Sequence, residues 1–179
     1  MSRVAAVAFS NVDSKVATTL SLVEKSLGMV PNIFATLGNA PVALDGFLAL
    51  SKTLSRGRLT ARQREIVALA VDQENECRYC LSAHTASSKG AGLDDAGALK
   101  ARNGDGEDGS DRAVAMFAKE IVRQRGHVSD KELERARKAG LDDGLVMEVV
   151  ANVALNTFTN YANEVADTEI DFPVVGVEL

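Results

Sequence analysis

Long apolar runs, clusters of basic residues and multiple cysteine pairs are all missing from this sequence of 179 residues. No stretch approaches the roughly 20 apolar residues that a membrane-spanning helix needs. The apolar run from residue 4 to residue 9 is too short for the core of a signal peptide. We therefore expect a soluble, cytoplasmic protein with no membrane partner. In a reducing compartment, the only two cysteines fit reversible catalytic use better than a structural disulfide.

Charge and length exclude further classes of protein. The formal net charge is −5 and the 20 lysines and arginines are scattered along the chain, so we expect no nucleic-acid partner. A chain of 179 residues with 46% hydrophobic content can bury one ordinary core. We predict a single domain over residues 1–179, in which residues 166–179 lack a helical period and form an extended C-terminal tail.

Helical periodicity runs through nearly the whole chain and predicts an all-α helical bundle. Thr60 and Ser129 each begin a sequence of the capping-box type, which marks the start of a helix. The first of these helices carries Glu65 in its second turn. A later helix is expected from about residue 76 to residue 89, with Asn75 as its N-cap.

This later helix gathers the rarest reactive groups of the chain. Cys77, Cys80 and His84 are spaced i, i+3, i+7, so they lie along one stripe. The helix dipole and a neighbouring imidazolium favour a thiolate and are expected to lower a cysteine pKa from about 8.5 toward neutrality. His84 lies one turn from Cys80, where it can take the thiol proton or stabilise the anion. We interpret Cys80 as the attacking thiol and Cys77 as the thiol that resolves it by closing a disulfide.

Other interpretations of the two cysteines remain open. A thioredoxin-type site would need strands around the motif, and the helical periodicity argues against them. A zinc site could use Cys77, Cys80, His84 and a carboxylate, although structural zinc sites usually draw on two separated ligand pairs and no second cluster exists here. The cysteines could also be inert and buried. The spacing alone favours a redox-active dithiol with no bound metal.

A glutamate twelve residues ahead of a C-x-x-C-x-x-x-H sequence gives a more specific pattern, formed by Glu65, Cys77, Cys80 and His84. This pattern resembles the alkylhydroperoxidase D-like branch of the carboxymuconolactone decarboxylase superfamily. Residues 29–34 (MVPNIF), 160–161 (NY) and 166–171 (ADTEID) look like its peroxidase-related members. The resemblance therefore covers most of the chain.

The resemblance implies an all-α homo-oligomer, a trimer or a hexamer, that acts as a thiol peroxidase or disulfide reductase in antioxidant defence. Its substrate would be a hydroperoxide or a disulfide, and its partner a peroxiredoxin or a lipoylated protein. It implies no bound cofactor, only an external thiol reductant such as a lipoyl-type dithiol. Carried over by position, Cys80 attacks, Cys77 resolves, His84 serves Cys80, and Glu65 connects to Cys77 or to the proton path of His84.

One position departs from some members of the family. The residue before the second cysteine can be another histidine of the relay, and here it is Tyr79, whose ordinary pKa of about 10 makes it a poorer proton shuttle. Tyr79 is expected to orient hydrogen bonds instead. The alternative functions are a cofactor-free decarboxylase that uses His84 and Glu65 as acid and base, and a zinc-binding or redox-sensing module without enzymatic activity.

The last predicted helix, about residues 143–165, is apolar except for a stripe of asparagines. Asn152, Asn156, Asn160 and Asn163 recur at intervals of four, four and three residues, which places them on one face. Buried amides need hydrogen-bond partners. The stripe therefore predicts a hydrogen-bonded helix or subunit interface, or a pocket around the dithiol that Asn156 or Asn160 would line.

Overall fold

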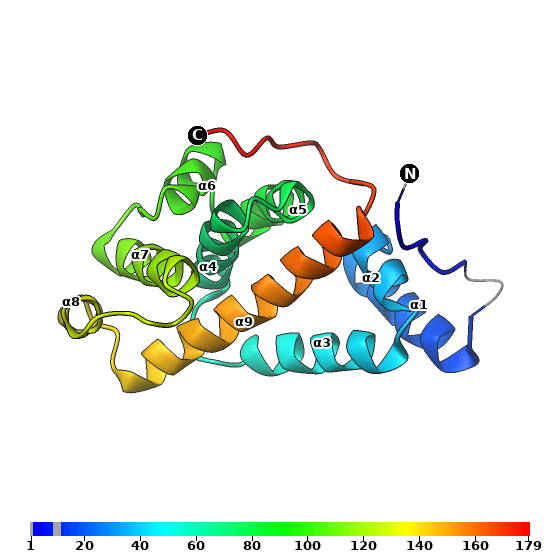
Figure 1. Cartoon of the computed structure of the whole chain (residues 1–179), viewed down its shortest axis with the longest axis horizontal. Helices are drawn as coiled ribbons and strands as arrows, with labels where there is room; N and C mark the ends of the chain where they lie inside the picture. The colour runs from blue at the N-terminus through cyan, green and yellow to red at the C-terminus, as the bar shows by residue number, and fades with distance from the viewer. Residues whose placement is uncertain (1, 9–11) are drawn as a thin grey trace.

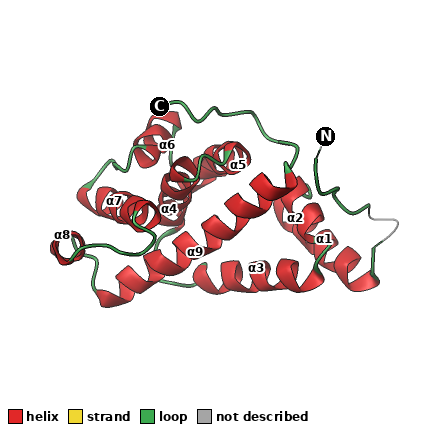
Figure 2. Ribbon diagram, in the orientation of Figure 1, coloured by secondary structure: helices red, strands yellow, loops and turns green. Residues whose placement is uncertain are grey.

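The computed structural model describes residues 2–8 and 12–179, and within these ranges it contains helices and no strand (Figure 2). The prediction of an all-α fold is confirmed. The α-helices follow one another as α1 (Ser14–Leu27), α2 (Asn32–Leu37), α3 (Pro41–Leu54), α4 (Ala61–Glu74), α5 (Arg78–Ser88), α6 (Asp95–Arg102), α7 (Gly109–Arg123), α8 (Asp130–Lys138) and α9 (Asp143–Ala166), with a short 3₁₀ turn, η2 (Lys89–Ala91), after α5.

Helix α4 lies at the centre and packs against α5, α6, α7 and α9 (Figure 1). Its residues 66–71 are all buried, so it is apolar around most of its circumference, as a helix enclosed by others must be. Thr60 and Gln63 form the predicted capping box at its start, and Ser129 with Glu132 forms the one that opens α8. Both predicted helix starts are confirmed.

Helix α9 is the longest, with 24 residues and a length of about 36 Å at 1.5 Å per residue. It crosses the molecule diagonally and contacts α2, α3, α4, α5 and α7 (Figure 1). Two hydrophobic clusters lie along it. The main cluster is formed by buried residues of α4, α6, α7, α8 and the first half of α9, including Leu69, Val71, Val114, Phe117 and Val149. The groove cluster is formed by Val16, Leu20, Ile33, Leu37, Leu44, Cys77, Tyr79 and Cys80.

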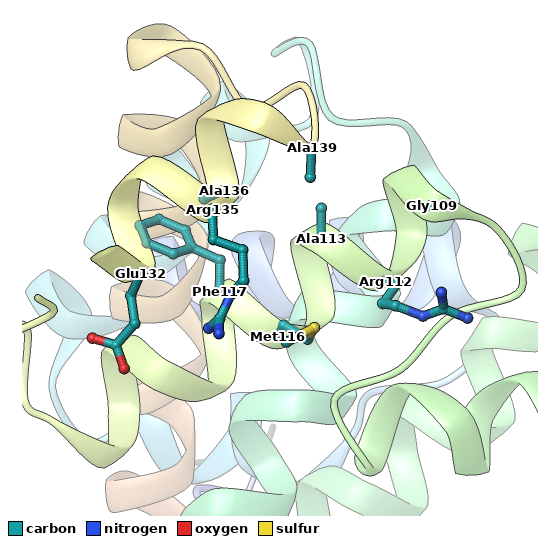
Figure 3. Close-up of a pocket in the computed structure, with 9 residues that line it drawn as sticks. All are labelled: Gly109, Arg112, Ala113, Met116, Phe117, Glu132, Arg135, Ala136 and Ala139. Carbon is teal, nitrogen blue, oxygen red and sulfur yellow. The ribbon is translucent and has the colours of Figure 1, made fainter. Parts of the chain in front are cut away.

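A small cavity of about 230 Å³ lies between α7 and α8. Figure 3 shows Phe117 and Met116 in its wall, with the charged ends of Arg112 and Glu132 directed away from its centre. Arg112 is instead paired with Asp105. None of the nine residues around this cavity is a cysteine or a histidine, so it offers none of the groups that the sequence analysis singled out.

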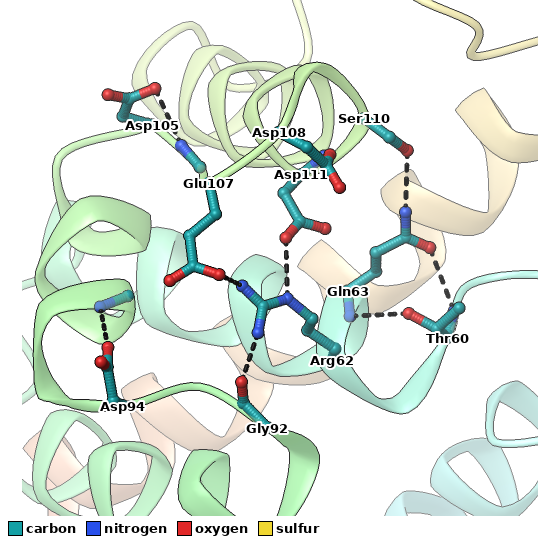
Figure 4. A network of polar contacts seen from close by, with 12 residues as sticks. Thr60, Arg62, Gln63, Gly92, Asp94, Asp105, Glu107, Asp108, Ser110 and Asp111 are labelled. Atoms are coloured by element: carbon teal, nitrogen blue, oxygen red, sulfur yellow. Dashed lines mark hydrogen bonds and ion pairs between the residues drawn. The ribbon is translucent and has the colours of Figure 1, made fainter.

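Arg62, near the start of α4, ties that helix to the segments before and after α6. Its Nε donates to Asp111 Oδ2 over 2.8 Å, and its two terminal nitrogens donate to the Gly92 carbonyl and to Glu107 (Figure 4). Asp111 is 4% exposed, so its carboxylate needs this charged donor. The network fixes the end of α4 that carries Glu65.

The chain leaves α9 at Asp167, which adopts a left-handed conformation, and residues 167–179 run without helix over α5 and α6 (Figure 1). The Val175 N–H donates to Ser82 Oγ over 3.0 Å. The buried guanidinium of Arg102 donates to the carbonyls of Gly176 and Glu178 over 2.8 and 3.0 Å. The tail is thus attached to the outer side of the helix that carries the cysteines. No helix in the described part of the chain is long and apolar enough to span a membrane.

Candidate active site

The helix with the cysteines begins later than predicted. Asn75 ends α4 instead of capping α5, and Glu76 takes a left-handed conformation with φ of 55°, which interrupts the helical path between them. Cys77 is the N-cap of α5, and its sulfur accepts the Cys80 N–H over 3.4 Å. The predictions that Asn75 is the N-cap and that Cys77 lies in the first turn were wrong, because the chain turns at Glu76 and the Asn75 amide bonds to Asn160 Oδ1 over 2.8 Å.

Both cysteines are unpaired thiols in the structure. Cys77 is fully buried, and Cys80 is 3% exposed. The cap interaction places Cys77 at the base of α5 and Cys80 one turn further along it. The side-chain amide of Asn163, on α9, donates to Cys80 Sγ over 3.2 Å. Cys80 lines the groove described below, and Cys77 does not.

His84 and Glu65 form a hydrogen-bonded ion pair across α5 and α4. His84 Nδ1 lies 2.9 Å from Glu65 Oε2, and Ser87 Oγ donates to the same oxygen over 2.9 Å. Their side chains are 28% and 22% exposed. Of the two connections predicted for Glu65, the structure contains the one to His84.

Asp72 is a further acidic group of the site that the sequence analysis missed. It is completely buried, its Oδ1 accepts from Asn160 Nδ2 over 2.7 Å, and its Oδ2 has no hydrogen-bond partner among the described residues. The Cys77 N–H donates to its backbone carbonyl over 3.0 Å. The available signal was a carboxylate directly after the apolar run of residues 66–71, seven positions after Glu65 and so on the same helix face.

These groups shift one another's pKa. Burial alone lowers the pKa of His84, but the carboxylates of Glu65 and Asp72 outweigh it and raise that pKa to about 10. Burial opposes ionisation of Glu65, yet the charge and hydrogen bond of His84 keep its pKa below the ordinary value. Burial raises the pKa of Asp72 to about 7, against the charge of His84 and the bond from Asn160. At neutral pH, His84 is therefore an imidazolium held by the Glu65 carboxylate.

The Cys80 thiol is harder to ionise than the sequence suggested. Its hydrogen bond with the Cys77 side chain, its burial and the charge of Asp72 raise the pKa of Cys80 well above the ordinary value, while the charge of His84 lowers it. The expectation of a pKa near neutrality was wrong for the reduced pair. It considered the helix dipole and His84 but not the hydrogen bond with Cys77, the burial or the Asp72 charge.

Tyr79 is occupied by structural hydrogen bonds. Its hydroxyl donates to Asp171 Oδ1 over 2.7 Å and accepts the Ile33 N–H over 3.2 Å, and its ring packs edge-on against Phe172. Burial and the bond to Asp171 raise the pKa of Tyr79. Asp171 also accepts the Asn32 N–H over 2.8 Å. Tyr79 thus joins α5 to α2 and the C-terminal tail, and it is no proton shuttle near neutral pH.

The asparagine stripe of α9 lies inside the chain, against the cysteines and α4. Asn160 bonds to Asp72, and Asn163 bonds to Cys80. Asn156 lines the groove, whereas its amide donates to the backbone carbonyl of Asn152 over 2.8 Å. Of the two candidates for the pocket, the structure places Asn156 in its wall, whereas Asn160 bonds to Asp72 and Asn75 outside it. Asn163 was predicted as a member of the stripe but not as a residue of the site.

A groove of about 880 Å³ opens onto Cys80 and His84. Its walls come from α1, α2, α3, α5 and α9, with Phe172 of the tail, and they are mainly apolar. Large side chains in these walls include Leu22, Leu27, Met29, Phe34, Phe47 and Leu155. The groove can therefore hold an apolar organic molecule against the Cys80 sulfur. No group of three or more His, Cys, Asp or Glu side chains in a metal-binding arrangement occurs in residues 2–8 and 12–179.

Fold and site together define an all-helical protein with a dithiol and a His–Glu pair at an apolar groove. The sequence model of the carboxymuconolactone decarboxylase family matches residues 41–119, a stretch that includes Glu65, Asp72, both cysteines and His84. The predicted resemblance to this family is confirmed over that stretch. Among curated proteins, no match was found.

Solved structures share the fold over nearly the whole chain. A peroxidase-related protein from Ralstonia eutropha with an alkylhydroperoxidase core aligns with a TM-score of 0.86 at 23% identity, covering 95% of this chain and 92% of its own. A peroxidase-related protein from a Silicibacter species aligns with a TM-score of 0.81 at 20% identity, and the alignment covers 93% of this chain and 92% of that protein. The debrominase Bmp8 aligns with a TM-score of 0.79 at 18% identity, and the alignment covers 94% of this chain and 91% of that protein. That structure is of a Cys-to-Ala variant in complex with 2,3,4-tribromopyrrole. At these identities, the likeness establishes the fold.

Proposed function

We propose that this protein is a thiol-dependent peroxidase or disulfide reductase in which Cys80 attacks the substrate and Cys77 resolves the product. The observation that carries the proposal is the position of Cys80, which lies in the wall of an apolar groove together with His84 and one turn after the N-cap residue Cys77. A cysteine pair one turn apart can close a short disulfide. The family supports a peroxidase-related or decarboxylase-like role, and the dithiol favours the first.

The peroxidase reaction balances with these groups alone. The Cys80 thiolate attacks the terminal oxygen of a hydroperoxide, the O–O bond breaks, and the alkoxide leaves as an alcohol once it is protonated. Cys77 then attacks the sulfenic acid on Cys80, forming the disulfide and releasing water. Two electrons pass from the dithiol to the peroxide. The proton of the Cys80 thiol passes to solvent when the thiolate forms. The alkoxide takes a proton from His84, which regains one from solvent, and the proton of the Cys77 thiol leaves in the water.

His84 acts in this scheme as an acid. Because its pKa is raised to about 10, it carries a proton at neutral pH and can give that proton to the departing alkoxide. Its positive charge also favours the thiolate of Cys80. Glu65 holds the imidazolium through Nδ1 over 2.9 Å, which leaves Nε2 as the nitrogen that delivers the proton.

The oxidised pair then needs an external reductant. A lipoyl-type dithiol fits the proposal, since it is apolar along its chain and ends in two thiols that can exchange with the Cys77–Cys80 disulfide. A lipoylated protein or a peroxiredoxin in the cytoplasm would be the partner, and a homo-oligomer, a trimer or a hexamer, would be the working form. Both follow from the family resemblance.

The test is a peroxide-consumption assay with dihydrolipoamide as reductant. Cys80→Ser should abolish the activity. Cys77→Ser should turn over more slowly than the intact protein, because the external dithiol must then resolve its sulfenic acid. His84→Ala should slow the reaction by about 100-fold, with His127→Ala, at the other, exposed histidine, as the matched control. Equal turnover in the intact protein and both cysteine variants would refute the mechanism.

The alternatives give different results in the same set of experiments. A decarboxylase that relies on His84 and Glu65 would keep its activity in Cys80→Ser. A zinc-binding module would contain stoichiometric zinc when purified under reducing conditions. Because a debrominase shares the fold, 2,3,4-tribromopyrrole belongs in the substrate panel beside organic hydroperoxides. Its consumption without any consumption of hydroperoxides would replace the peroxidase proposal.

A further inference from the structure

Asn163 contacts the sulfur that we assign as the nucleophile. It lies on α9 one turn after Asn160, is 3% exposed, and donates from Nδ2 to Cys80 Sγ over 3.2 Å. In the described part of the chain, it is the only side-chain N–H donor to this sulfur. A hydrogen bond to the charged form of a group favours that form. The amide thus opposes the burial and the Asp72 charge that disfavour the thiolate.

The other end of the same amide lacks a partner. Asn163 Oδ1 is buried and accepts no hydrogen bond from any residue that the structure describes, although buried polar atoms are nearly always paired. Asn163 also lines the groove next to Cys80. An unpaired carbonyl oxygen beside the nucleophile is therefore available to a hydrogen-bond donor that enters through the groove.

We propose that Asn163 is a catalytic residue with two functions: its Nδ2 stabilises the Cys80 thiolate, and its Oδ1 accepts the O–H of the bound hydroperoxide. The second function rests on the proposed peroxidase activity. A hydroperoxide carries its hydrogen on the terminal oxygen, which is the atom that sulfur attacks. A bond from that hydrogen to Oδ1 would hold the terminal oxygen beside Sγ and turn the O–O bond away from it, toward His84.

The proposed contact is compatible with the course of the reaction. When sulfur attacks, the S–O bond forms and the O–O bond breaks, while the terminal oxygen keeps its hydrogen and becomes the hydroxyl of the sulfenic acid. The alkoxide takes its proton from His84. The hydrogen bond to Oδ1 therefore persists from substrate to sulfenic acid. An aspartate at this position would offer only acceptors and would add a negative charge beside the thiolate.

Two reactions of the full-length protein separate the two functions. Alkylation of Cys80 by iodoacetamide, followed by peptide mass spectrometry across a pH series, depends on the thiolate but involves no O–H. Single-turnover oxidation by cumene hydroperoxide depends on both. Asn163→Ala and the volume-conserving Asn163→Leu are the test variants. Asn152→Ala is the matched control, since Asn152 is also buried on α9 but its side-chain amide donates to the Glu148 carbonyl and not to Cys80.

Loss of Nδ2 should slow alkylation at pH 8 by about tenfold and raise the alkylation pKa by about one unit, as expected for one hydrogen bond to an anion. Oxidation should slow by about 100-fold or more, because the acceptor is lost as well. Alkylation equal to that of Asn152→Ala in both test variants would overturn the donor function. Equal losses in the two reactions would overturn the acceptor function. If the intact protein reduces no hydroperoxide, the proposed peroxidase fails, and alkylation still decides whether Asn163 acts on Cys80.

Discussion

Replacing Asp72 with asparagine should change how the stability of the protein depends on pH. Asp72 is fully buried, and only one of its two carboxylate oxygens accepts a hydrogen bond. Its pKa in the folded protein is about 7, against an ordinary value of 3.8. The folded chain therefore binds a proton at Asp72 more tightly than the unfolded chain does. Stability from this group is complete below about pH 4 and is lost as the pH rises from 4 to 7.

The size of the effect follows from the two pKa values. One unit corresponds to about 1.4 kcal/mol, so ionisation of Asp72 costs the fold about 4 kcal/mol at pH 8 and about 2 kcal/mol at pH 5. An asparagine side chain at this position does not titrate and carries no such pH-dependent term. We expect the free energy of unfolding of Asp72→Asn, relative to the wild type, to rise by roughly 2 to 3 kcal/mol between pH 5 and pH 8.

Urea denaturation at pH 5, 6, 7 and 8 measures this difference directly. A constant cost of the unpaired amide N–H in Asp72→Asn would shift every point equally and leave the slope unchanged. Asp95→Asn, at an aspartate with a side chain 77% exposed, controls for the loss of one negative charge. Parallel stability curves for the wild type and Asp72→Asn would show that Asp72 is ionised throughout this range and would refute the reasoning.

Three further changes test the surroundings of the site. Glu65→Gln removes a carboxylate that raises the pKa of His84, so NMR titration of His84 should give a value below 10, and an unchanged value would contradict the pairing. Tyr79→Phe leaves Asp171 without its phenol donor and should lower the free energy of unfolding in urea by about 2 kcal/mol. A loss below about 0.5 kcal/mol, the smallest net value expected for a hydrogen bond, would contradict this. Arg102→Met removes the donors to two tail carbonyls. If their loss lowers the free energy of tail detachment by about 2 kcal/mol, proteolysis of residues 173–179 should become about 30-fold faster. An unchanged rate would mean that the tail is held by other contacts.

The helices were predictable because their signals are local. Periodicity and the capping residues Thr60 and Ser129 depend only on neighbours in the sequence. The start of α5 was not predictable in the same way, because it depends on a left-handed residue, Glu76, that is not glycine. Such a conformation is uncommon for a glutamate, and no local pattern indicates it.

The candidate site was predictable where its members share one helix and not where they meet across helices. Cys77, Cys80 and His84 are adjacent by spacing alone. Asp72 and Asn163 come close to them only because α4 and α9 pack against α5. Their effect on the Cys80 thiol is therefore a consequence of tertiary structure. The pKa of that thiol is raised first by its bond with Cys77 and then by burial and the Asp72 charge, and the last two depend on this packing.

The groove cluster and the main cluster are separate parts of the interior, and the groove belongs to the smaller one. We expect the amides of α1 to α3 to exchange with deuterium before those of α4 and α7, since local opening begins where less apolar surface is buried. The mouth of the groove can then loosen to admit a bulky molecule while the scaffold under the sulfurs stays folded. Substitutions that change the shape of the groove entrance therefore need not destabilise the helices that hold the reacting groups.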